Sequence, residues 1–263
     1  MRAAVVGMVL LCGIAQGAEP NSIGMELIEI PAGTFTMGSP VGEKDREANE
    51  AQVTVTLTKP FWLGKTEVTQ GQWRQVMGTE PWKGMKFVQA DKDWPATYVS
   101  WDDATTFCQN LTEIERKAGK LKADEEYRLA TEAEWEYACR AGTTTAYSFG
   151  DDEKQLGEYA WFNGNALDVD EKYAHAVGLK KPNPWGLHDM HGNVAEWCSD
   201  WYDEKLSGGT DPVGPGGGSF RRLRGGSWGL SPDYCRSAAR LNYAPSYRLN
   251  HLGFRVARSQ SAQ

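Results

Sequence analysis

One stretch of the sequence, RGGSWGLSPDYCRSAAR from Arg224 to Arg240, carries a side chain with distinctive chemistry, the thiol of Cys235. A thiolate is a nucleophile and a soft ligand that favours Cu(I). Two thiolates in a linear array hold that ion well, but this stretch contains a single cysteine. A lone thiolate would need help from Met or His to bind copper. Cys235 is therefore a candidate catalytic residue that lacks a second thiol beside it.

The same stretch opens a longer segment, Trp228–His251, whose side chains are typical of binding surfaces. Tyrosine and tryptophan offer large amphipathic contact areas, and Asn, Ser and Arg offer adaptable hydrogen bonds. We expect the segment to contact a peptide, protein or glycan ligand, although any loop-rich domain also carries Tyr and Asn in its loops. The candidate ligand-binding residues are Trp228, Tyr234, Asn242, Tyr243, Tyr247 and Arg248.

The composition favours one globular domain. A chain of 263 residues with 40% hydrophobic content is long and apolar enough for a core. The 29 glycines and 11 tryptophans suit a loop-rich fold better than a helical bundle, because glycine permits tight corners and large rings bury much area. The net charge of −7 argues against a nucleic-acid partner, which needs a basic surface.

The N-terminus has the pattern of a secretory signal. Arg2 precedes the apolar run AAVVGMVLLCGIA, and small residues follow at Gly17 and Ala18. This predicts a signal peptide over residues 1–17 and an exported protein, periplasmic or secreted, with an uncleaved anchor or a lipoprotein as the alternatives. The run is shorter than the roughly 20 residues that span a bilayer. No second such segment follows, so we expect no integral membrane protein.

Two helices and several short strands are expected. A helix should begin after Ser100 and end near Gly119, and a second should begin after Thr131, which forms a capping box with Glu134, and end at Gly142. Met25–Ser39 reads as strand, turn and strand, and Val53–Thr58 as a further strand. Beyond Gly142 we expect little regular structure. The fold class is therefore α+β, loop-rich, with short strands and two main helices.

Eight motifs, in chain order, resemble the sulfatase-modifying-factor domain, the fold of the formylglycine-generating enzyme. The resemblance spans residues 25–258 and implies a variant of the C-type-lectin fold, usually stabilised by calcium. That fold serves an oxidase that activates sulfatases, periplasmic maturation proteins, sulfoxide synthases and hypervariable ligand-binding proteins, so it does not by itself select a function. The motifs are MELIEIPAGTFTMGS, FWLGKTEVTQGQW, PATYVSWDDATTFC, YRLATEAEWEYACRAG, GLHDMHGNVAEWCSDWY, RLRGGSW, CRSAAR and LGFRVAR.

The resemblance implies a copper site only where two cysteines follow GGS. Here Leu230 occupies the first position and cannot bind a metal, and Cys235 falls on the second when counted from GGS. When aligned on RSAAR, Cys235 lies beside a structural cysteine of the family that bridges the helix cysteine matching Cys139. We therefore expect a Cys139–Cys235 disulfide. A free Cys235 that binds copper and a Cys235 that is buried or otherwise paired are the alternatives.

The resemblance also implies calcium in DMHGNVAEW. The expected ligands are the carboxylates of Asp189 and Glu196 and the carbonyls of Gly192 and Val194, hard oxygens that suit Ca²⁺. The alternative is a glycine turn in which both acids cap backbone. A second calcium ion is an open alternative at Asn163, Asn165, Asp168 and Asp170. The paired histidines His188 and His191 we interpret as loop residues.

The leading hypothesis is an exported, calcium-stabilised member of this family that is not an oxidase and binds a ligand on its C-terminal loop surface. One alternative is a formylglycine-generating oxidase that acts on a sulfatase cysteine through Cys235. Another is a periplasmic maturation enzyme of the same family. The residue that separates these hypotheses is Leu230, which opposes the two-cysteine copper site and is neutral toward binding.

Overall fold

The computed structural model describes residues 20–259, so the signal peptide predicted for residues 1–17 lies outside the described part of the chain. Among the described residues, no helix is long and apolar enough to cross a membrane. The strands and α-helices are β1 (Leu27–Ile30), β2 (Gly33–Met37), β3 (Val53–Leu57), β4 (Phe61–Gly64), α1 (Gln70–Met77), α2 (Trp101–Lys117), β5 (Tyr127–Leu129), α3 (Glu132–Arg140), α4 (Leu156–Tyr159), β6 (Ala195–Trp201), β7 (Gly209–Thr210), β8 (Arg221–Arg224), β9 (Leu241–Tyr243), β10 (Leu252–Gly253) and β11 (Val256–Ser259). Short 3₁₀ turns are η1 (Ala48–Glu50), η2 (Glu153–Gln155), η3 (Asn163–Asn165), η4 (Leu167–Val169) and η5 (Pro232–Cys235).

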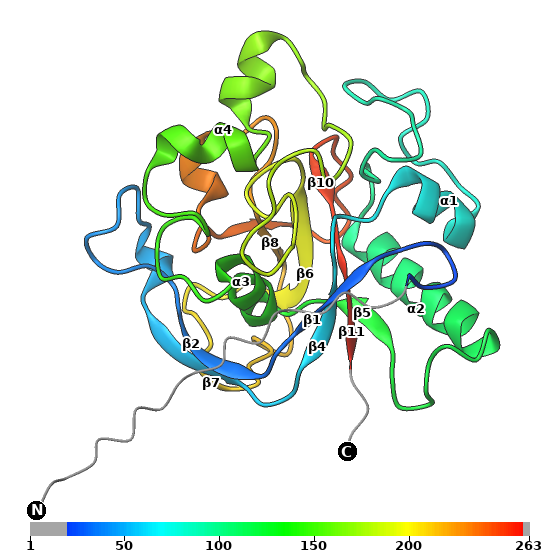
Figure 1. The fold of residues 1–263 in the computed structure, drawn as a ribbon, viewed down its shortest axis with the longest axis horizontal. Helices are drawn as coiled ribbons and strands as arrows, with labels where there is room; N and C mark the ends of the chain where they lie inside the picture. The colour runs from blue at the N-terminus through cyan, green and yellow to red at the C-terminus, as the bar shows by residue number, and fades with distance from the viewer. Residues whose placement is uncertain (1–19, 260–263) are drawn as a thin grey trace, which may run out of the picture.

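The described strands form three small sheets, and the α+β, loop-rich fold class is confirmed. Their orders are β1-β4-β11-β5, β10-β6-β8-β9 and β2-β3-β7. Figure 1 shows α3 in the middle of the molecule between the sheets, and α1 and α2 on one side. The last strand, β11, lies between β4 and β5, so the first sheet joins both ends of the described chain.

The strands predicted around Pro31 form, but they do not pair with each other. β1 pairs with β4, whereas β2 pairs with β3, so the turn at Pro31–Gly33 passes the chain from one sheet to another. Alternation of side chains identifies a strand but not its partner. The third predicted strand is confirmed as β3.

Both predicted helices form with the expected caps. The Ser100 hydroxyl accepts the N–H of Asp103, and the Thr131 hydroxyl accepts the N–H of Glu134, each within a complete capping box. A third helix, α1, begins in the same way at Thr69, whose hydroxyl accepts the N–H of Gln72. α2 buries one face, and α3 is buried along its whole length.

Most of the described chain beyond Gly142 is irregular, as expected, but short strands also form there. β6 has seven residues, more than any other described strand, and β7, β8, β9, β10 and β11 follow it. β6 was not predicted because it buries Glu196 and Asp200 among apolar residues. The sequence therefore lacks the alternation of apolar and polar residues that indicates a strand.

Buried ion pairs hold α3 to the C-terminal half of the chain. Arg140 Nε donates to Glu136 Oε1 at 2.8 Å, and Arg224 Nη2 pairs with the other Glu136 oxygen. Arg240 binds Glu132 through two bonds of 2.7 and 2.9 Å. We call these five residues the α3 cluster. Burial alone would raise the pKa of Glu132, but the arginines around it outweigh burial and hold the pKa at about 2.

Candidate functional site

The thiol of Cys235 lies beneath the glycine turn of the GGS motif. A Cβ on Gly226, whose φ is +71°, would lie 2.7 Å from the Cys235 sulfur, so a larger residue there would clash. Cys235 has no exposed surface, and burial raises the pKa of its thiol and so disfavours the thiolate. Its apolar neighbours are Ala146, Tyr147, Leu156 and Ala160, with Phe149 and Phe162 packed against them.

These surroundings do not fit a copper centre. Leu230 has a hydrocarbon side chain, and its backbone bonds to Asn163 and Ser227 at 2.9 and 3.0 Å. Among the described residues, the cluster around Cys235 contains no second thiol and no thioether. A metal that oxidises a substrate thiol must also be reachable by that substrate, whereas Cys235 is sealed from solvent. We therefore derive no oxidation step through copper.

The disulfide expected between Cys139 and Cys235 is not formed in the structure, where both are free thiols. The Cys139 sulfur lies 3.7 Å from the hydroxyl oxygen of Ser237. Cys235 ends η5 with its sulfur against the Gly226 turn, and Ser237 is the residue that faces α3. The residue opposite Cys139 is therefore Ser237, two positions after the expected Cys235. Since serine cannot form a disulfide, no bridge can form at this place.

The DMHGNVAEW loop has a tightly turned backbone. Asp189 and Asn193 have φ values of 59° and 61°, in the left-handed region that few side chains favour. A Cβ on Gly192 would lie 2.2 Å from the carbonyl oxygen of Trp161, so the loop approaches its neighbour more closely than another residue would allow. The N–H of Asn193 donates to that same oxygen at 2.8 Å. The loop is therefore locked in place.

A buried glutamate that sequence analysis did not select, Glu67, lies against this loop. Its carboxylate accepts long hydrogen bonds, both 3.3 Å, from the N–H of Val194 and the side chain of Asn193. Burial raises the pKa of Glu67 well above its ordinary value, and the carboxylates of Asp189 and Glu196 raise it further. The only sequence signal was its place in FWLGKTEVT, one of the motifs that carry the resemblance.

Asp189 carries an unpaired oxygen in the same region. Its Oδ2 accepts the N–H of Gly178 at 2.7 Å, but the buried Oδ1 has no hydrogen-bond partner among the described residues. Burial raises the pKa of Asp189 to about 6. Glu196 is better satisfied, because both its oxygens accept from Arg255 at 2.6 to 2.9 Å and one also accepts the indole N–H of Trp135 at 2.7 Å.

We call Glu67, Asp189, Glu196 and Arg255 the carboxylate cluster, and its residues fit a calcium ion. Arg255 pairs with Glu196, whereas the buried carboxylates of Glu67 and Asp189 form no ion pair with a described residue, and burying uncompensated charge is costly. A cation would be held by Asp189 and Glu67 together with the Gly192 and Val194 carbonyls, and it would tie the loop to the end of β4. Within residues 20–259 no three acidic, histidine or cysteine side chains converge on one position, so backbone oxygens must complete the ligand set.

Two of the four side chains considered for a second calcium ion, those of Asn165 and Asp170, serve other roles. The Asn165 side chain accepts from the N–H of Phe162 and donates to the carbonyl of Ala160, both at 2.9 Å. Asp170 pairs with Lys172 at 2.7 Å. Asn165 therefore stabilises its own turn, and nothing in this segment resembles the unpaired oxygen of Asp189.

The two histidines of the loop have structural contacts. His188 Nδ1 lies 2.8 Å from the carbonyl of Lys180. His191 is buried, with Nδ1 2.9 Å from the carbonyl of Cys235 and Nε2 3.1 Å from the N–H of Ser148. Burial lowers the pKa of His191 to about 4, so the ring is neutral near pH 7, donating from Nδ1 and accepting at Nε2. His191 thus links the loop to η5.

Four of the six expected ligand-binding residues lie close together. Tyr243 ends β9, and its ring centroid is 5.4 Å from that of Tyr247, which is 48% exposed. Asn242 precedes Tyr243 in the same strand, and Arg248 follows Tyr247. We call these four residues the tyrosine surface. Its aromatic pair offers a ligand two adjacent rings near solvent.

Backbone contacts fix the tyrosine surface to the start of α2. The carbonyl of Pro245 accepts the N–H of Trp101 at 3.0 Å, and the carbonyl of Leu249 accepts the N–H of Tyr98 at 3.0 Å. Arg248 binds both carboxylate oxygens of Asp103 at 2.8 and 3.0 Å. Burial would raise the pKa of Asp103, but the bonds from Arg248 and Ser100 outweigh it and lower that pKa. Arg248 therefore positions the surface more than it faces a ligand.

The remaining two expected ligand-binding residues lie elsewhere. Trp228 is 5% exposed and packs with Ala166, Ala174 and Val194, so it supports the interior and does not present a binding face. Tyr234 lies within η5, the turn that carries Cys235. Spacing along the chain could not separate these residues from the surface tyrosines, because the segment crosses the core between them.

The profile of the sulfatase-modifying factor enzyme 1-like domain matches residues 16–260 of this chain. The chain belongs to this family. The formylglycine-generating enzyme of Streptomyces coelicolor is 30% identical over 291 residues, which cover 88% of each protein. Among solved structures, Treponema denticola variable protein 1 matches with a TM-score of 0.78 and 31% identity, over 93% of this chain and 99% of its own. PvdO from Pseudomonas aeruginosa matches with a TM-score of 0.80 and 28% identity, over 94% and 99%.

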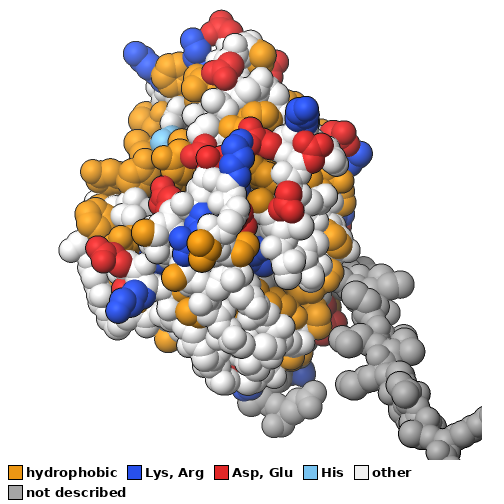
Figure 2. Space-filling model, turned by 90° about the vertical axis from the view of Figure 1, so that its left-hand side faces the viewer, with side chains coloured by type: hydrophobic (Ala, Val, Ile, Leu, Met, Phe, Trp, Pro, Cys, Tyr) orange, Lys and Arg blue, Asp and Glu red, His pale blue; other side chains and the backbone are white. Residues whose placement is uncertain are grey.

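These sulfatase-modifying factor relatives carry different names, so family membership leaves the activity open. The charges on the outer surface do not indicate a particular class of partner. On the face shown in Figure 2, acidic and basic side chains are interspersed, and no continuous basic patch is visible there.

Proposed function

We propose that this sulfatase-modifying factor protein is an exported binding protein that does not generate formylglycine. The observation that carries the proposal is the pair Leu230 and Cys235: a hydrocarbon side chain stands at the first copper position, and the remaining thiol is buried under the Gly226 turn. Two accessible thiolates are what copper chemistry on a thiol substrate requires. This chain supplies neither the pair nor the access.

The proposed ligand surface is the tyrosine surface, and the proposed ligand is a peptide, protein or glycan. Tyr243 and Tyr247 provide exposed ring area, and the Arg248–Asp103 pair keeps the loop in one conformation before a ligand arrives. A preorganised loop loses less entropy on binding. A calcium ion in the carboxylate cluster would rigidify the frame and take no part in chemistry.

An oxidase assay tests the absence of activity. The protein would be loaded with Cu(I) under oxygen and incubated with a Cys-x-Pro-x-Arg peptide, and mass spectrometry would follow conversion of the peptide thiol to an aldehyde. We expect no conversion. Conversion that is lost in Cys235→Ser but kept in Cys198→Ser, a matched buried cysteine, would establish the formylglycine-generating alternative, which the identity to the Streptomyces coelicolor enzyme makes worth testing.

A binding screen tests the surface. Immobilised peptides and glycans would be probed with the wild-type chain, with Tyr243→Ala/Tyr247→Ala, and with Tyr159→Ala as a control tyrosine on α4. We expect captured ligands to be lost in the double variant and kept in the control. Ligands that bind all three proteins equally would contradict the assignment of the surface.

A further inference from the structure

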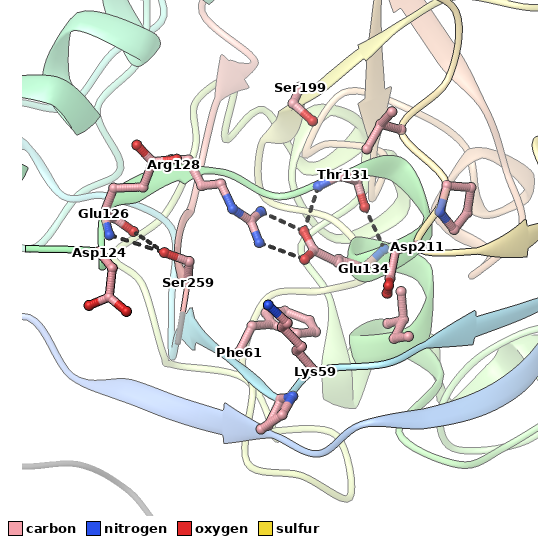
Figure 3. Close-up of a pocket in the computed structure, with 14 residues that line it drawn as sticks. Lys59, Phe61, Asp124, Glu126, Arg128, Thr131, Glu134, Ser199, Asp211 and Ser259 are labelled. Atoms are coloured by element: carbon pink, nitrogen blue, oxygen red, sulfur yellow. Dashed lines mark hydrogen bonds and ion pairs between the residues drawn. The ribbon is translucent and has the colours of Figure 1, made fainter. Parts of the chain in front are cut away.

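A cavity of about 610 Å³ lies beside the start of α3 and shares no lining residue with the carboxylate cluster or the tyrosine surface. Figure 3 shows its residues arranged around an open centre. They come from the turn between β3 and β4, from β5, from the start of α3 and from the segment that follows β7. A volume of this size is typical of ligand sites, which range over roughly 300 to 1,000 Å³.

The lining of the cavity is partly apolar. Its apolar residues are Leu57, Pro60, Phe61, Pro212 and Val213. Val213 is 68% exposed, whereas Phe61 is 2% exposed. An aliphatic or aromatic side chain that enters the cavity would therefore remove Val213 from water.

The charges around these walls favour a cation. Arg128 and Glu134 neutralise each other through two bonds of 2.6 Å, visible in Figure 3. That pair aside, the lining contains the carboxylates of Asp124, Glu126 and Asp211 against one lysine, Lys59. Glu126 and Asp211 lie on opposite sides of the opening. The rim is therefore net negative.

The helix end beside the cavity offers nothing to an anion. The first N–H groups of α3 attract negative charge when they are free. Here the N–H of Thr131 donates to Glu134 at 2.9 Å, the N–H of Glu132 to Asp200 at 2.8 Å, and the N–H of Glu134 to the Thr131 hydroxyl at 3.1 Å. Side chains of the protein therefore already accept hydrogen bonds from these N–H groups at the start of α3.

An exposed strand leads into the cavity and suits a main chain. β7 is an edge of its sheet in the described chain, and both its residues are exposed. Asp211 follows it and is held in place by the N–H of Thr58 at 2.8 Å. An extended peptide can pair with such an edge and place alternate side chains in a neighbouring pocket.

We propose that this cavity binds a peptide segment of a partner protein in which an apolar residue adjoins a lysine or arginine. The apolar side chain packs against Pro60, Pro212 and Val213, and the cation faces Glu126 and Asp211. Lys59 also lines the cavity, is exposed and makes no ion pair with a described residue, so its charge lowers the affinity for a cation.

Two matched tetrapeptides test the proposal. Acetyl-Gly-Leu-Arg-Gly-amide and acetyl-Gly-Leu-Glu-Gly-amide would be titrated into the ¹⁵N-labelled full chain, and amide shifts would be followed at Val213 and Ser259, which line the cavity, and at Tyr247 as a distant reference. We expect saturable shifts at Val213 and Ser259 with the arginine peptide and none at Tyr247. No saturable shift, equal binding of the glutamate peptide, or shifts centred on Tyr247 would overturn the proposal.

Charge variants sharpen the test because they leave the walls intact. Glu126→Gln should weaken the arginine peptide about two- to fivefold, and Lys59→Gln should strengthen it by a similar factor, as expected for single exposed charges. Glu113→Gln on the exposed face of α2 should change nothing. Weaker binding in Lys59→Gln would show that the cavity prefers an anion and would refute the assignment.

Discussion

Two buried groups of charges in this molecule have opposite balances. In the α3 cluster, two glutamates meet three arginines, and the pKa of Glu132 is held at about 2. In the carboxylate cluster, Arg255 pairs with Glu196, the pKa values of Glu67 and Asp189 are raised, and one Asp189 oxygen has no partner. Both groups are buried to a similar degree. Burial alone therefore does not distinguish a structural ion network from a ligand site.

The difference lies in the balance of charges. In the α3 cluster the guanidinium groups outnumber the carboxylates, although the buried Nε of Arg224 has no hydrogen-bond partner among the described residues, and removing one of these charges should destabilise the protein. A group of acids with raised pKa values and an orphan oxygen is incomplete, and a cation from solution can complete it. The four predictions below test this distinction, beginning with the change expected to be largest.

Breaking the α3 cluster should cost the most. Arg224→Met removes a buried partner of Glu136 and leaves that carboxylate with Arg140 alone. We expect the free energy of unfolding to fall by about 3–5 kcal/mol, measured by urea denaturation. Lys117→Met, which removes an exposed pair with Glu113, should change it by less than about 1 kcal/mol. Equal effects of the two substitutions would show that the network is dispensable.

Adding a covalent link beside the α3 cluster should stabilise it. Ser237→Cys places a thiol opposite the sulfur of Cys139, where Ser237 Oγ now lies at 3.7 Å. A bridge there closes a loop of about a hundred residues and could add up to about 4–5 kcal/mol in the chain-entropy model. Thiol counting before and after reduction would detect it, and Cys235→Ser in the same background should not prevent it. Two free thiols under oxidising conditions would contradict the geometry.

Asp200 lies next to the α3 cluster, but its pKa is raised whereas that of Glu132 is lowered. Its titration should therefore make the stability of the protein depend on pH. Burial, and then the charge of Glu132, raise its pKa to about 7, above the unfolded value near 3.9. The folded state therefore holds the proton more tightly, so the contribution of this group to stability is complete below about pH 4 and is lost as the pH rises through about 7.

Asp200→Asn should therefore stabilise the protein by roughly 2–4 kcal/mol at pH 8 and by little at pH 4. Its amide oxygen can still accept the N–H of Glu132, as Asp200 Oδ2 does at 2.8 Å. Thermal unfolding at both pH values would measure the difference, with the exposed Asp168→Asn as control. Equal stabilisation at both pH values would mean that charge is not the cause.

Completing the carboxylate cluster should give the smallest of these effects. Calcium at a hundred times its Kd should raise the free energy of unfolding by about 2.7 kcal/mol, and a chelator should reverse the gain. Asp189→Ala should abolish the response, and Asp170→Asn should not. Glu67→Gln should raise stability in chelator by about 1 kcal/mol while weakening the calcium response. A melting temperature that ignores both calcium and chelator would refute the site.

The sequence predicted those elements whose signals are local. The caps of α2 and α3 were identified because a capping box occupies four adjacent residues. α1 has the same box at Thr69 but was missed, because its eight residues bury only Gln70 and Trp73 and so show no apolar face. β6 was missed because its interior holds acids.

Site residues were predictable where one motif contains them. Asp189 and Glu196 stand in a single loop, whereas Glu67 reaches it from the end of β4, and no spacing connects the two. Cys235 was predicted to face Cys139, but Ser237 does so, because the η5 turn determines which side chain points toward α3. Trp228 and Tyr243 look alike in sequence, and only the path of the chain buries one and leaves the other near the surface.

The position of β11 has a consequence for how the chain is made. Residues 256–259 form a strand between β4 and β5, so the sheet that begins at Leu27 cannot close until those residues have left the ribosome. Until then the edge of β4 that β11 covers in the folded protein has no strand beside it, and unpaired edges favour aggregation. Folding of this protein is therefore a late event in its synthesis, and holdase chaperones should act on the unfinished chain.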